Sequence, residues 1–325
     1  ELDDLLDWGF DKQELDLDLW ACEPPEDVEP PEDVEPQIDK AEELRVKWGV
    51  ETGQLWQLGE HRLVCGDCTD KAVADKLMQE EIAELLFTSP PYADMRTYDD
   101  INDLSIEKII EFIPTFREFA NYQAINLGIK RENGEIVEYW NAYINKAKES
   151  GYKFLSWNVW NREQTTSIGL QQSFFPIFHE WIFVFGTSLK EINKTKPKSE
   201  SSYERQKYTK KGTRRNKDGK LRPAERGDVS SDFVKIGTVI TLKAANTIGN
   251  SMHPAMYPVE LPEEYIKAIT NYNDIIIDPF LGSGTTIIAC ERLGRKCRAV
   301  EISPAYVAVA IQRWVDVTGK EPVLL

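Results

Sequence analysis

The sequence predicts an α/β fold in which helices cover both faces of a mostly parallel β-sheet. Two nearly uninterrupted apolar runs, residues 82–88 and 275–277, are typical of strands buried on both faces of such a sheet. The second run opens a succession of strand, glycine-rich turn, helix, strand and helix that ends near residue 315. This succession is typical of a Rossmann-like βαβ unit, which gives the predicted fold its class.

The elements before this unit follow from periodicity and from turn residues. Apolar residues on either side of a Gly59-Glu60-His61 turn predict a β-hairpin over 54–65. Residues 71–80 are expected to be helical, and residues 105–150 mostly helical with a break at Asn133-Gly134. Two further stretches, 152–160 and 181–185, predict strands.

The composition changes after residue 186. Residues 187–235 are rich in Lys, Arg, Ser, Gly and Thr, so we expect a loop-rich insertion there. A short strand over 239–242 and an amphipathic helix over 260–270 follow. The βαβ unit then supplies the strand over 275–277, a helix over 285–293, a strand over 297–301 and a helix over 304–315.

The formal net charge of −16 is unevenly distributed along the chain. Residues 1–43 hold 18 Asp and Glu against 2 Lys and Arg, so the excess negative charge lies in this segment. The sequence PEDVEP occurs twice over 25–36, and this density of proline and like charge predicts an extended acidic tail or linker. Residues 190–226 carry 14 Lys and Arg against 5 Asp and Glu, a concentrated basic patch.

The composition also excludes several classes of protein. Hydrophobic residues make up 41% of the chain, which supports a substantial core and excludes full disorder, collagen and coiled coil. No apolar run approaches the roughly 20 residues of a membrane span, and the acidic N-terminus does not resemble a signal peptide. The five cysteines are odd in number and scattered, so we expect a protein of the reducing cytoplasm. Because the chain begins with Glu1, we expect a processed product or part of a longer polypeptide with an upstream domain.

The turn over 278–286, DPFLGSGTT, offers a site for a nucleotide-like ligand. Gly282 and Gly284 let the backbone approach a ligand, and the following helix presents free N–H groups. Glu301 ends the next strand 17 residues after Gly284, near the distance at which a carboxylate accepts hydrogen bonds from both ribose hydroxyls. The loop lacks the GxGxxG pattern and the lysine of a phosphate loop, which favours a cofactor with a ribose and no phosphate. A purely structural turn is the alternative.

The hexapeptide FTSPPY over 87–92 follows the first apolar run. Pro90 and Pro91 remove two N–H donors and fix φ, which leaves carbonyl oxygens beyond the strand end. Ser89 adds a hydroxyl and Tyr92 a flat aromatic face. Such a group can accept hydrogen bonds from an –NH₂ group and stack a planar ring. A rigid turn that only ends the strand is the alternative.

Together, FTSPPY and DPFLGSGTT resemble the motifs of the β group of DNA amino-methyltransferases, in which the catalytic motif precedes the cofactor motif. RLVCGD over 62–67, HPAMYPVEL over 253–261 and VEISP over 300–304 resemble further segments of that family. The resemblance covers residues 50–316 and implies a Rossmann-like methyltransferase fold with S-adenosylmethionine as cofactor. It implies catalytic Ser89, Pro90, Pro91 and Tyr92; cofactor-binding Asp67, Asp278, Pro279, Phe280, Gly282, Ser283, Gly284, Thr285, Thr286 and Glu301; DNA-binding Lys207, Lys210, Lys211, Arg214 and Arg215; and no metal.

The resemblance also implies a bacterial, phage or prophage-like context, and it predicts a domain order and partners. Double-stranded DNA is the expected partner, a membrane is not, and a homodimer is left open. The predicted order is an acidic tail or linker (1–43), a catalytic half (44–186), a basic DNA-recognition insertion (187–235) and a cofactor-binding half (236–325).

The implied reaction is methyl transfer to the exocyclic amine of a base that has been flipped out of the duplex. Ser89 and the Pro90 carbonyl would accept amine hydrogens and so expose the nitrogen lone pair, while Tyr92 stacks the base. Serine before the prolines favours cytosine N4, with adenine N6 as the alternative; the chain has no Pro-Cys pair for methylation at cytosine carbon 5. A non-catalytic DNA-binding module on this fold is a further alternative, as is a methyltransferase acting on RNA or a protein glutamine.

Some residues that could carry other chemistry are interpreted as structural. Cys65 and Cys68 have CxxC spacing without a second pair, so a turn beside the cofactor is favoured over zinc. Trp157 and Trp160 are expected in the core, and His179 is expected to be structural. A side chain at position 284 is expected to abolish cofactor binding, because it would fill the space that the methionine part of the cofactor needs.

Overall fold

A computed structural model describes residues 31–91, 105–163, 177–190, 192–193, 195–197, 213–215, 221–223, 233–243 and 257–325. Its helical elements are η2 (Ile38–Lys40), α2 (Ala41–Trp48), α3 (Lys71–Met78), α4 (Ile106–Ile109), α5 (Phe112–Thr115), α6 (Trp140–Glu149), α8 (Glu260–Ile269), α9 (Thr285–Leu293) and α10 (Pro304–Thr318). Its strands are β1 (Leu55–Leu58), β2 (His61–Cys65), β3 (Ala83–Thr88), β4 (Ala120–Leu127), β5 (Arg131–Glu132), β6 (Glu135–Ile136), β7 (Lys153–Asn161), β8 (His179–Gly186), β9 (Thr195–Pro197), β10 (Thr213–Arg215), β11 (Leu221–Pro223), β12 (Phe233–Lys235), β13 (Val239–Thr241), β14 (Ile275–Asp278), β15 (Lys296–Glu301) and β16 (Val323–Leu324).

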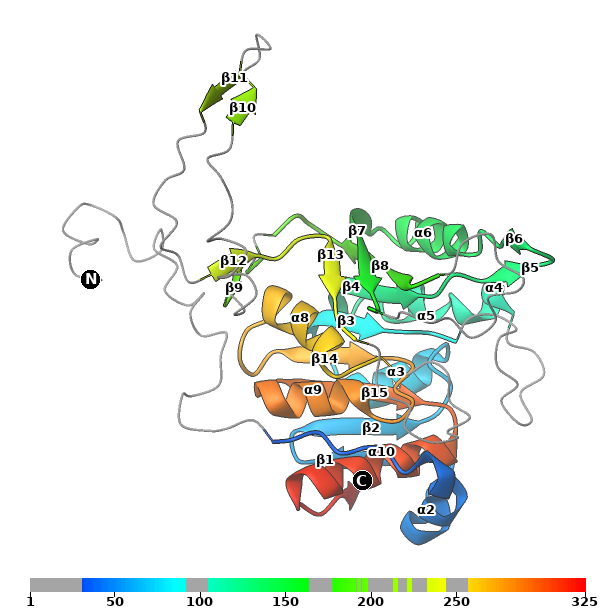
Figure 1. Cartoon of the computed structure of the whole chain (residues 1–325). Coiled ribbons are helices and arrows are strands. Elements are labelled where there is room, and N and C mark those ends of the chain that lie inside the picture. Colours follow the sequence, from blue (N-terminus) through cyan, green and yellow to red (C-terminus); the bar gives the residue numbers. More distant parts are fainter. Residues whose placement is uncertain are drawn as a thin grey trace. The chain divides into compact units, whose positions relative to one another are not determined.

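A ten-stranded mixed sheet organises the main unit, in the order β13-β7-β8-β4-β3-β14-β15-β2-β1-β16 (Figure 1). Its central strands β4, β3, β14, β15 and β2 are all parallel to one another, whereas β8 runs antiparallel to both β4 and β7. The predicted mostly parallel α/β sheet is therefore confirmed. The carboxyl ends of its five central strands lie along one edge, where ligands of such folds bind.

Successive residues of the central strands alternate between two hydrophobic cores, one on each face of the sheet. On one face, Leu85 and Phe87 of β3 belong to a core that includes α2, α8, α9 and α10. On the other face, Leu86 belongs to a core that includes α3, α4, α5 and α6. All three side chains are fully buried, and each such burial contributes about 1.5–3 kcal/mol to stability. Helices thus cover both faces, as the continuous apolar run of β3 predicts.

The prediction that residues 105–150 are mostly helical is wrong. The eight-residue strand β4 lies in the middle of this segment and pairs with β3 and β8. Its sequence, ANYQAINL, contains alanine, glutamine and leucine, which favour helices in isolation. Burial in the sheet overrides that preference, since its last six residues are all buried. The predicted break is a turn between β5 and β6, in which Asn133 and Gly134 both have positive φ.

The tryptophans of β7 differ in burial. Trp160 is buried as predicted, whereas Trp157 is 46% exposed, so its assignment to the core is wrong. One part of the Trp157 ring packs edge-on against Trp181 and Phe183, with centroids 5.3 and 5.2 Å away. The other described boundaries agree with the predicted elements within a few residues, including the β1–β2 hairpin, in which Leu58 pairs with His61.

A second compact unit covers Asn193–Gly237, close to the predicted limits of the insertion at 187–235. Within it, β9 pairs with β12 and β10 pairs with β11, both antiparallel. At the other end of the chain, helical structure begins at η2 and α2, before the predicted domain start at residue 44. Within the ranges that the structure describes, every helix is too short or too polar to cross a bilayer.

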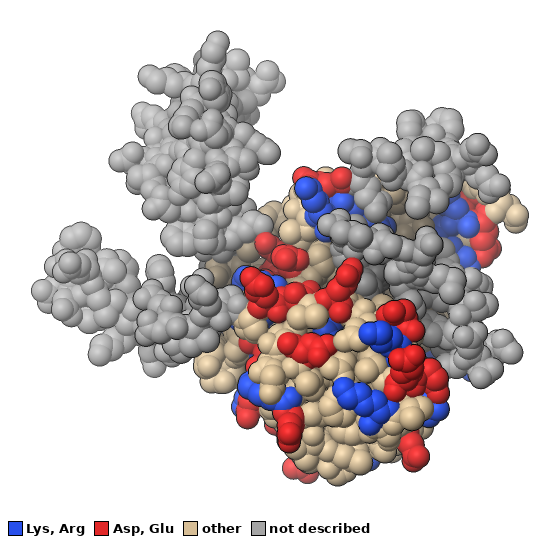
Figure 2. Space-filling model, turned by 60° about the horizontal axis from the view of Figure 1, so that its bottom comes forward, with Lys and Arg blue, Asp and Glu red and all other residues tan. Residues whose placement is uncertain are grey.

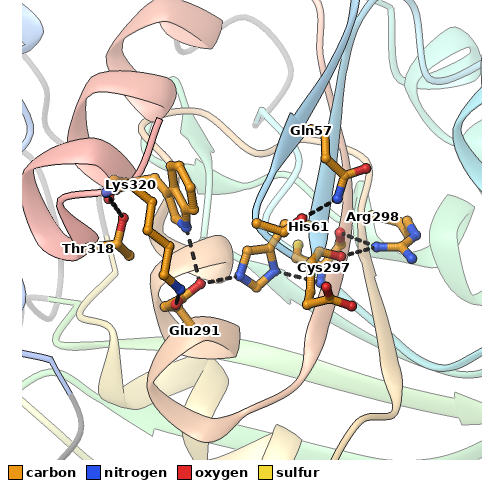
Figure 3. Close-up of polar contacts among 10 residues, drawn as sticks. Gln57, His61, Glu291, Cys297, Arg298, Thr318 and Lys320 are labelled. Carbon is orange, nitrogen blue, oxygen red and sulfur yellow. Dashed lines mark hydrogen bonds and ion pairs between the residues drawn. The ribbon is translucent and has the colours of Figure 1, made fainter. Parts of the chain in front are cut away.

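A buried histidine ties the amino-end edge of the sheet to helices α9 and α10 (Figure 3). His61 Nδ1 accepts a hydrogen bond from the Cys297 amide at 2.9 Å, so the ring proton lies on Nε2 and is donated to Glu291 at 2.8 Å. Glu291 also accepts from Trp314 Nε1 at 3.1 Å and from Lys320 Nζ at 2.8 Å. Burial raises the pKa of Glu291, but the hydrogen bonds from His61 and Lys320 outweigh it and lower that pKa to about 2.

Glu291→Gln is expected to make unfolding easier by about 2–3 kcal/mol near neutral pH. The folded-state pKa of Glu291 lies below its ordinary value of 4.5, so its stabilisation is full above pH 4.5 and is lost as pH falls towards 2. Urea unfolding of both proteins between pH 7 and pH 2.5 measures this. The two stability curves should converge on the acid side; a constant offset would contradict the assignment.

Candidate active site

The two sequence motifs meet because β3 and β14 are neighbours in the sheet. Leu85 pairs with Ile276 and Leu86 with Ile277 in parallel register, although nearly 200 residues separate the strands. The turn that starts with Ser89 and the loop after Asp278 therefore leave the sheet side by side, at the carboxyl ends of their strands. This adjacency is the first requirement for a site built from both motifs.

Asp278 connects the motifs directly. Its fully buried carboxylate accepts hydrogen bonds from Thr88 Oγ1 at 2.7 Å, Thr286 Oγ1 at 2.6 Å and the Phe280 amide at 3.1 Å. Tyr257, whose hydroxyl lies 3.0 Å from Thr286 Oγ1, also donates to it at 3.4 Å. Burial raises the pKa of Asp278, and hydrogen bonds from Thr286 and Thr88 oppose this shift. Asp278 and Thr286 thus fix the loop to β3; Thr88 and Tyr257 are members of this link that were not among the predicted site residues.

The glycines of the loop have different structural roles. Gly282 and Gly284 both have positive φ, +57° and +93°. A methyl group at Gly282 would have no atom within 4 Å, so this position faces open space beside the loop. A methyl group at Gly284 would lie 3.2 Å from Cα and Cβ of Ala310 on α10. Gly284 thus allows the close approach of α10, a role that the sequence did not reveal, and Gly282 borders the open space.

A buried arginine supports the back of the loop. Arg313 of α10 donates to the Ser283 carbonyl and to Thr285 Oγ1, both at 3.2 Å. Its Nη2 donates to both carboxylate oxygens of Asp33 at 2.9 Å. Asp33 belongs to the predicted acidic tail or linker, so part of that segment is ion-paired beside the glycine-rich loop. The pattern of charges could not reveal this pair, because 280 residues separate its members.

Glu301 lies at the end of β15, beside the loop. Its carboxylate accepts from the Gly282 amide at 2.8 Å and from the Ser303 amide at 2.9 Å, and only 7% of the residue is exposed. Burial raises the pKa of Glu301, against the hydrogen bonds from Ser303 and Gly282. Its carbonyl accepts from the Gly66 amide at 3.0 Å, which places the exposed Asp67 at the neighbouring strand end. The Glu301 carboxylate at this strand end suits the hydroxyls of a ribose, and Asp67 at the neighbouring strand end suits the adenine, so these residues fit the implied cofactor.

The remaining residues of the two motifs lie around this group. Pro279 is buried, and Phe280 packs edge-on against Phe112 with centroids 5.2 Å apart. Ser89 and Pro91 are half-buried and Pro90 is buried, immediately after β3. Ser89 Oγ accepts a hydrogen bond from Asn126 Nδ2 at 3.3 Å. Tyr92 lies outside the described residues.

The structure describes little of the predicted DNA contacts. Arg214 and Arg215 lie in β10, where Arg214 pairs in register with Arg222 of β11, while Lys207, Lys210 and Lys211 lie outside the described residues. On the described part of the face in Figure 2, acidic and basic side chains are interspersed. That part of the face does not form a continuous basic surface. The contact of the insertion with DNA is not tested by these residues and stays a prediction.

Cys65 and Cys68 are both buried and unbridged. Burial raises the pKa of Cys65 to about 11 and that of Cys68 well above its usual range. Both thiols are therefore neutral near pH 7, as in a turn packed against the sheet. Among the described residues, no group of three or more His, Cys, Asp or Glu side chains has an arrangement that could hold a metal ion.

Comparisons with known proteins agree with this geometry. Two solved structures share the fold: a cytosine-N4-specific PvuII DNA methyltransferase (TM-score 0.54, 17% identity, 81% of this chain and 89% of that one) and an M1.HpyAVI–SAM complex (TM-score 0.51, 22% identity, 77% and 97%). The PvuII enzyme is a DNA methyltransferase, so the fold is the Rossmann-like methyltransferase fold. Residues 83–312 match the DNA methylase family N6_N4_Mtase. The chain belongs to this family of S-adenosylmethionine-dependent DNA methyltransferases.

Relatives along most of the chain are bacterial methyltransferases. The type II methyltransferase M.ScaI of Streptomyces caespitosus is 26% identical over 251 residues, which are 73% of this chain and 77% of M.ScaI. The orphan methyltransferase M.BamHII of Bacillus amyloliquefaciens is 26% identical over 266 residues, 76% of this chain and 89% of M.BamHII. The similarity therefore extends well beyond the two short motifs.

Alanine at the two loop glycines is expected to have different effects. Gly284→Ala should lower the free energy of unfolding by about 1–3 kcal/mol, because of its positive φ and the close approach of Ala310. Gly282→Ala should cost about 1 kcal/mol of backbone strain, and should weaken S-adenosylmethionine binding at least tenfold by filling the space beside the loop. Urea unfolding and calorimetric titration with the cofactor measure these effects. Undiminished cofactor affinity in folded Gly282→Ala would place the cofactor elsewhere.

Proposed function

We propose that the chain transfers a methyl group from S-adenosylmethionine to the exocyclic amine of a flipped DNA base, and that cytosine N4 is the target. The observation that carries this proposal is the position of Ser89, directly after β3 and beside the loop that follows β14. Serine in place of aspartate before the two prolines supports cytosine. The PvuII enzyme with the same fold, which is cytosine-N4-specific, adds support at the level of the fold.

The proposed cofactor site consists of Asp67, Gly282 and Glu301, with Pro279, Phe280, Ser283, Gly284 and Thr285 shaping the loop around it. When bound, S-adenosylmethionine supplies an electrophilic methyl group on a sulfonium. Glu301 and Asp67 would accept hydrogen bonds from its hydroxyl and amine groups, and the open space at Gly282 would admit it. Asp278 and Thr286 hold the loop in place through Thr88.

The proposed catalytic group is Ser89 with the prolines and Tyr92. Amine nitrogen on a pyrimidine is a weak nucleophile, because its lone pair is delocalised into the ring. Ser89 Oγ and the Pro90 carbonyl would each accept one amine hydrogen, which draws the hydrogens from the ring plane and localises the lone pair. Tyr92 would stack the flipped base. These roles require Ser89 to be held in one orientation.

Adenine N6 is the alternative target, because both amines need the same acceptors and the family includes both activities. A non-catalytic DNA-binding module would keep the fold and lose the reaction. The basic insertion, 187–235, is proposed to contact the phosphate backbone. The acidic segment before η2 is proposed to be a tail or linker. A homodimer is left open.

Incubation of the protein with methyl-labelled S-adenosylmethionine and DNA of mixed sequence is expected to label the DNA. Mass spectrometry of the digested product should show N4-methylcytosine. Ser89→Ala should lower kcat about 10- to 100-fold, because one acceptor for the amine is removed. Ser150→Ala, which removes a hydroxyl bonded to the Lys146 carbonyl at the far end of α6, should leave kcat unchanged.

Two results would redirect this proposal. N6-methyladenine as the only product would overturn the choice of cytosine while leaving the amino-methyltransferase reaction intact. Absence of label in the DNA, with normal cofactor and DNA binding, would favour the non-catalytic module.

Replacing Lys210, Lys211, Arg214 and Arg215 with glutamine is expected to weaken binding to all DNA sequences by a similar factor. The slope of log K against log salt should become shallower by about 0.9 for each phosphate that is no longer neutralised by a side chain. Fluorescence anisotropy at several salt concentrations measures both. Glutamine at Lys148, near the end of α6, and at Lys153, at the start of β7, is the control; both lysines belong to the main unit, and their replacement should leave the slope unchanged. Equal slopes for all variants would show that the insertion does not bind phosphates.

A further inference from the structure

A continuous row of polar side chains crosses four neighbouring strands at the edge of the sheet that holds the site. Ser89 follows β3, Asn126 is near the end of β4, Glu180 is near the start of β8 and Arg162 follows β7. Asn126 Nδ2 donates to Ser89 Oγ at 3.3 Å and to Glu180 Oε2 at 2.8 Å. Arg162 Nη1 donates to Glu180 Oε1 at 3.2 Å. The row therefore ends on the proposed catalytic hydroxyl.

The strand register accounts for this row. Thr88 pairs with Ile125 in the parallel β3–β4 ladder, so Ser89 comes next to Asn126. In the antiparallel β4–β8 ladder, Asn126 lies opposite Ile182. Glu180 is two residues before Ile182 and thus shares its face, within diagonal reach of Asn126. Sheet geometry alone brings the three side chains together.

The orientation of the Asn126 amide follows from its neighbours. The Glu180 carboxylate can only accept, so the NH₂ group must face it, and the same group then reaches Ser89 Oγ. A reversed amide would place its oxygen against the carboxylate and lose the bond to Glu180. Glu180, in turn, is held by Arg162 from the other side. The amide is thus fixed as a donor towards Ser89.

Packing does not explain why these groups are buried. Asn126 is 1% exposed and Glu180 is 7% exposed, in strands whose other buried residues are mainly apolar. Burying a carboxylate and an amide is unfavourable unless both are bonded, and apolar residues would pack in their place at lower cost. A buried polar row that ends on a proposed catalytic group therefore points to a role in positioning that group.

We propose that Asn126 and Glu180 are positioning residues that fix the hydroxyl of Ser89 for the target amine. This inference rests on the proposed function of Ser89. One lone pair of Ser89 Oγ receives the Asn126 N–H, which selects one side-chain rotamer and directs the second lone pair towards an amine hydrogen. Glu180 acts through Asn126, because it holds the amide in the donating orientation. Neither residue needs to contact the base or the cofactor.

The first test compares Asn126→Ala with Asn121→Ala. Asn121 lies on the same strand, at its other end, and donates to Glu84, which pairs with Lys190 at 2.6 Å. Asn121, Glu84 and Lys190 thus repeat the arrangement of Asn126, Glu180 and Arg162, but far from Ser89. Asn126→Ala should lower kcat about 10- to 100-fold with unchanged cofactor affinity, and Asn121→Ala should leave kcat unchanged. Equal kcat values for the two variants would overturn the inference.

Glu180 variants test the indirect role. Glu180→Gln keeps an acceptor for the Asn126 amide, so it should retain more activity than Glu180→Ala. Glutamine and alanine variants with the same kcat would show that Glu180 does not act by orienting the amide. Circular dichroism and cofactor affinity, measured for every variant, separate loss of folding from loss of positioning.

A double-mutant cycle decides whether Asn126 acts through Ser89. In the Ser89→Ala background, Asn126→Ala should have no further effect on the single-turnover rate, because the hydroxyl that it positions is absent. Independent effects that multiply would overturn the inference. The side-chain amide signal of Asn126 in a ¹⁵N–¹H spectrum, assigned from Asn126→Ala, should also shift in Ser89→Ala. This readout needs no activity, so an unshifted signal would refute the positioning contact even if the proposed reaction failed.

Discussion

The buried carboxylate of Asp278 is the interaction on which the site depends. It accepts from Thr88 in one motif and from Thr286 in the other, so it joins two loops that leave neighbouring strands. A buried carboxylate is stable only when its oxygens are bonded, and its four protein donors meet that need. Any displacement of the loop from β3 would leave this group unpaired. The position of the loop after β14 relative to Ser89 is therefore set by contacts within the protein.

The same principle extends along the carboxyl-end edge of the sheet. Glu301 secures the Gly282 amide on one side of Asp278, and Asn126 with Glu180 secures Ser89 on the other. Strand ends supply polar groups that must be bonded, whereas the strand interiors are apolar and pack against helices. The amino-end edge carries a different network around His61 and Glu291, which joins β2 and β15 to α9 and α10. The first edge serves the site and the second serves stability.

The acidic N-terminal segment has a structural contact as well as a charge. Asp33 pairs with Arg313, and Arg313 donates a hydrogen bond to the carbonyl of Ser283 within the glycine-rich loop. Arg313 is 5% exposed, so the pair shields a cation that would be costly to bury alone. Movement of the segment near residue 33 would therefore displace Arg313 and alter its hydrogen bond to Ser283. The acidic segment is therefore not only a linker, because its residue Asp33 is bound to helix α10 of the folded unit.

The sequence by itself determined the buried strands β3 and β14, the glycine-rich loop, the terminal acid Glu301 and the family, because each depends on local pattern or on a contiguous motif. It placed Ser89 and Asp278 at strand ends but could not show that Thr88 joins them. It missed β4, since ANYQAINL has helix-favouring residues and becomes a strand only by burial between β3 and β8. With β4 missed, the contact between Asn126 and Ser89 could not be predicted. Only the tertiary structure decided which polar residues meet, because strand order and register bring together side chains that are far apart in the chain.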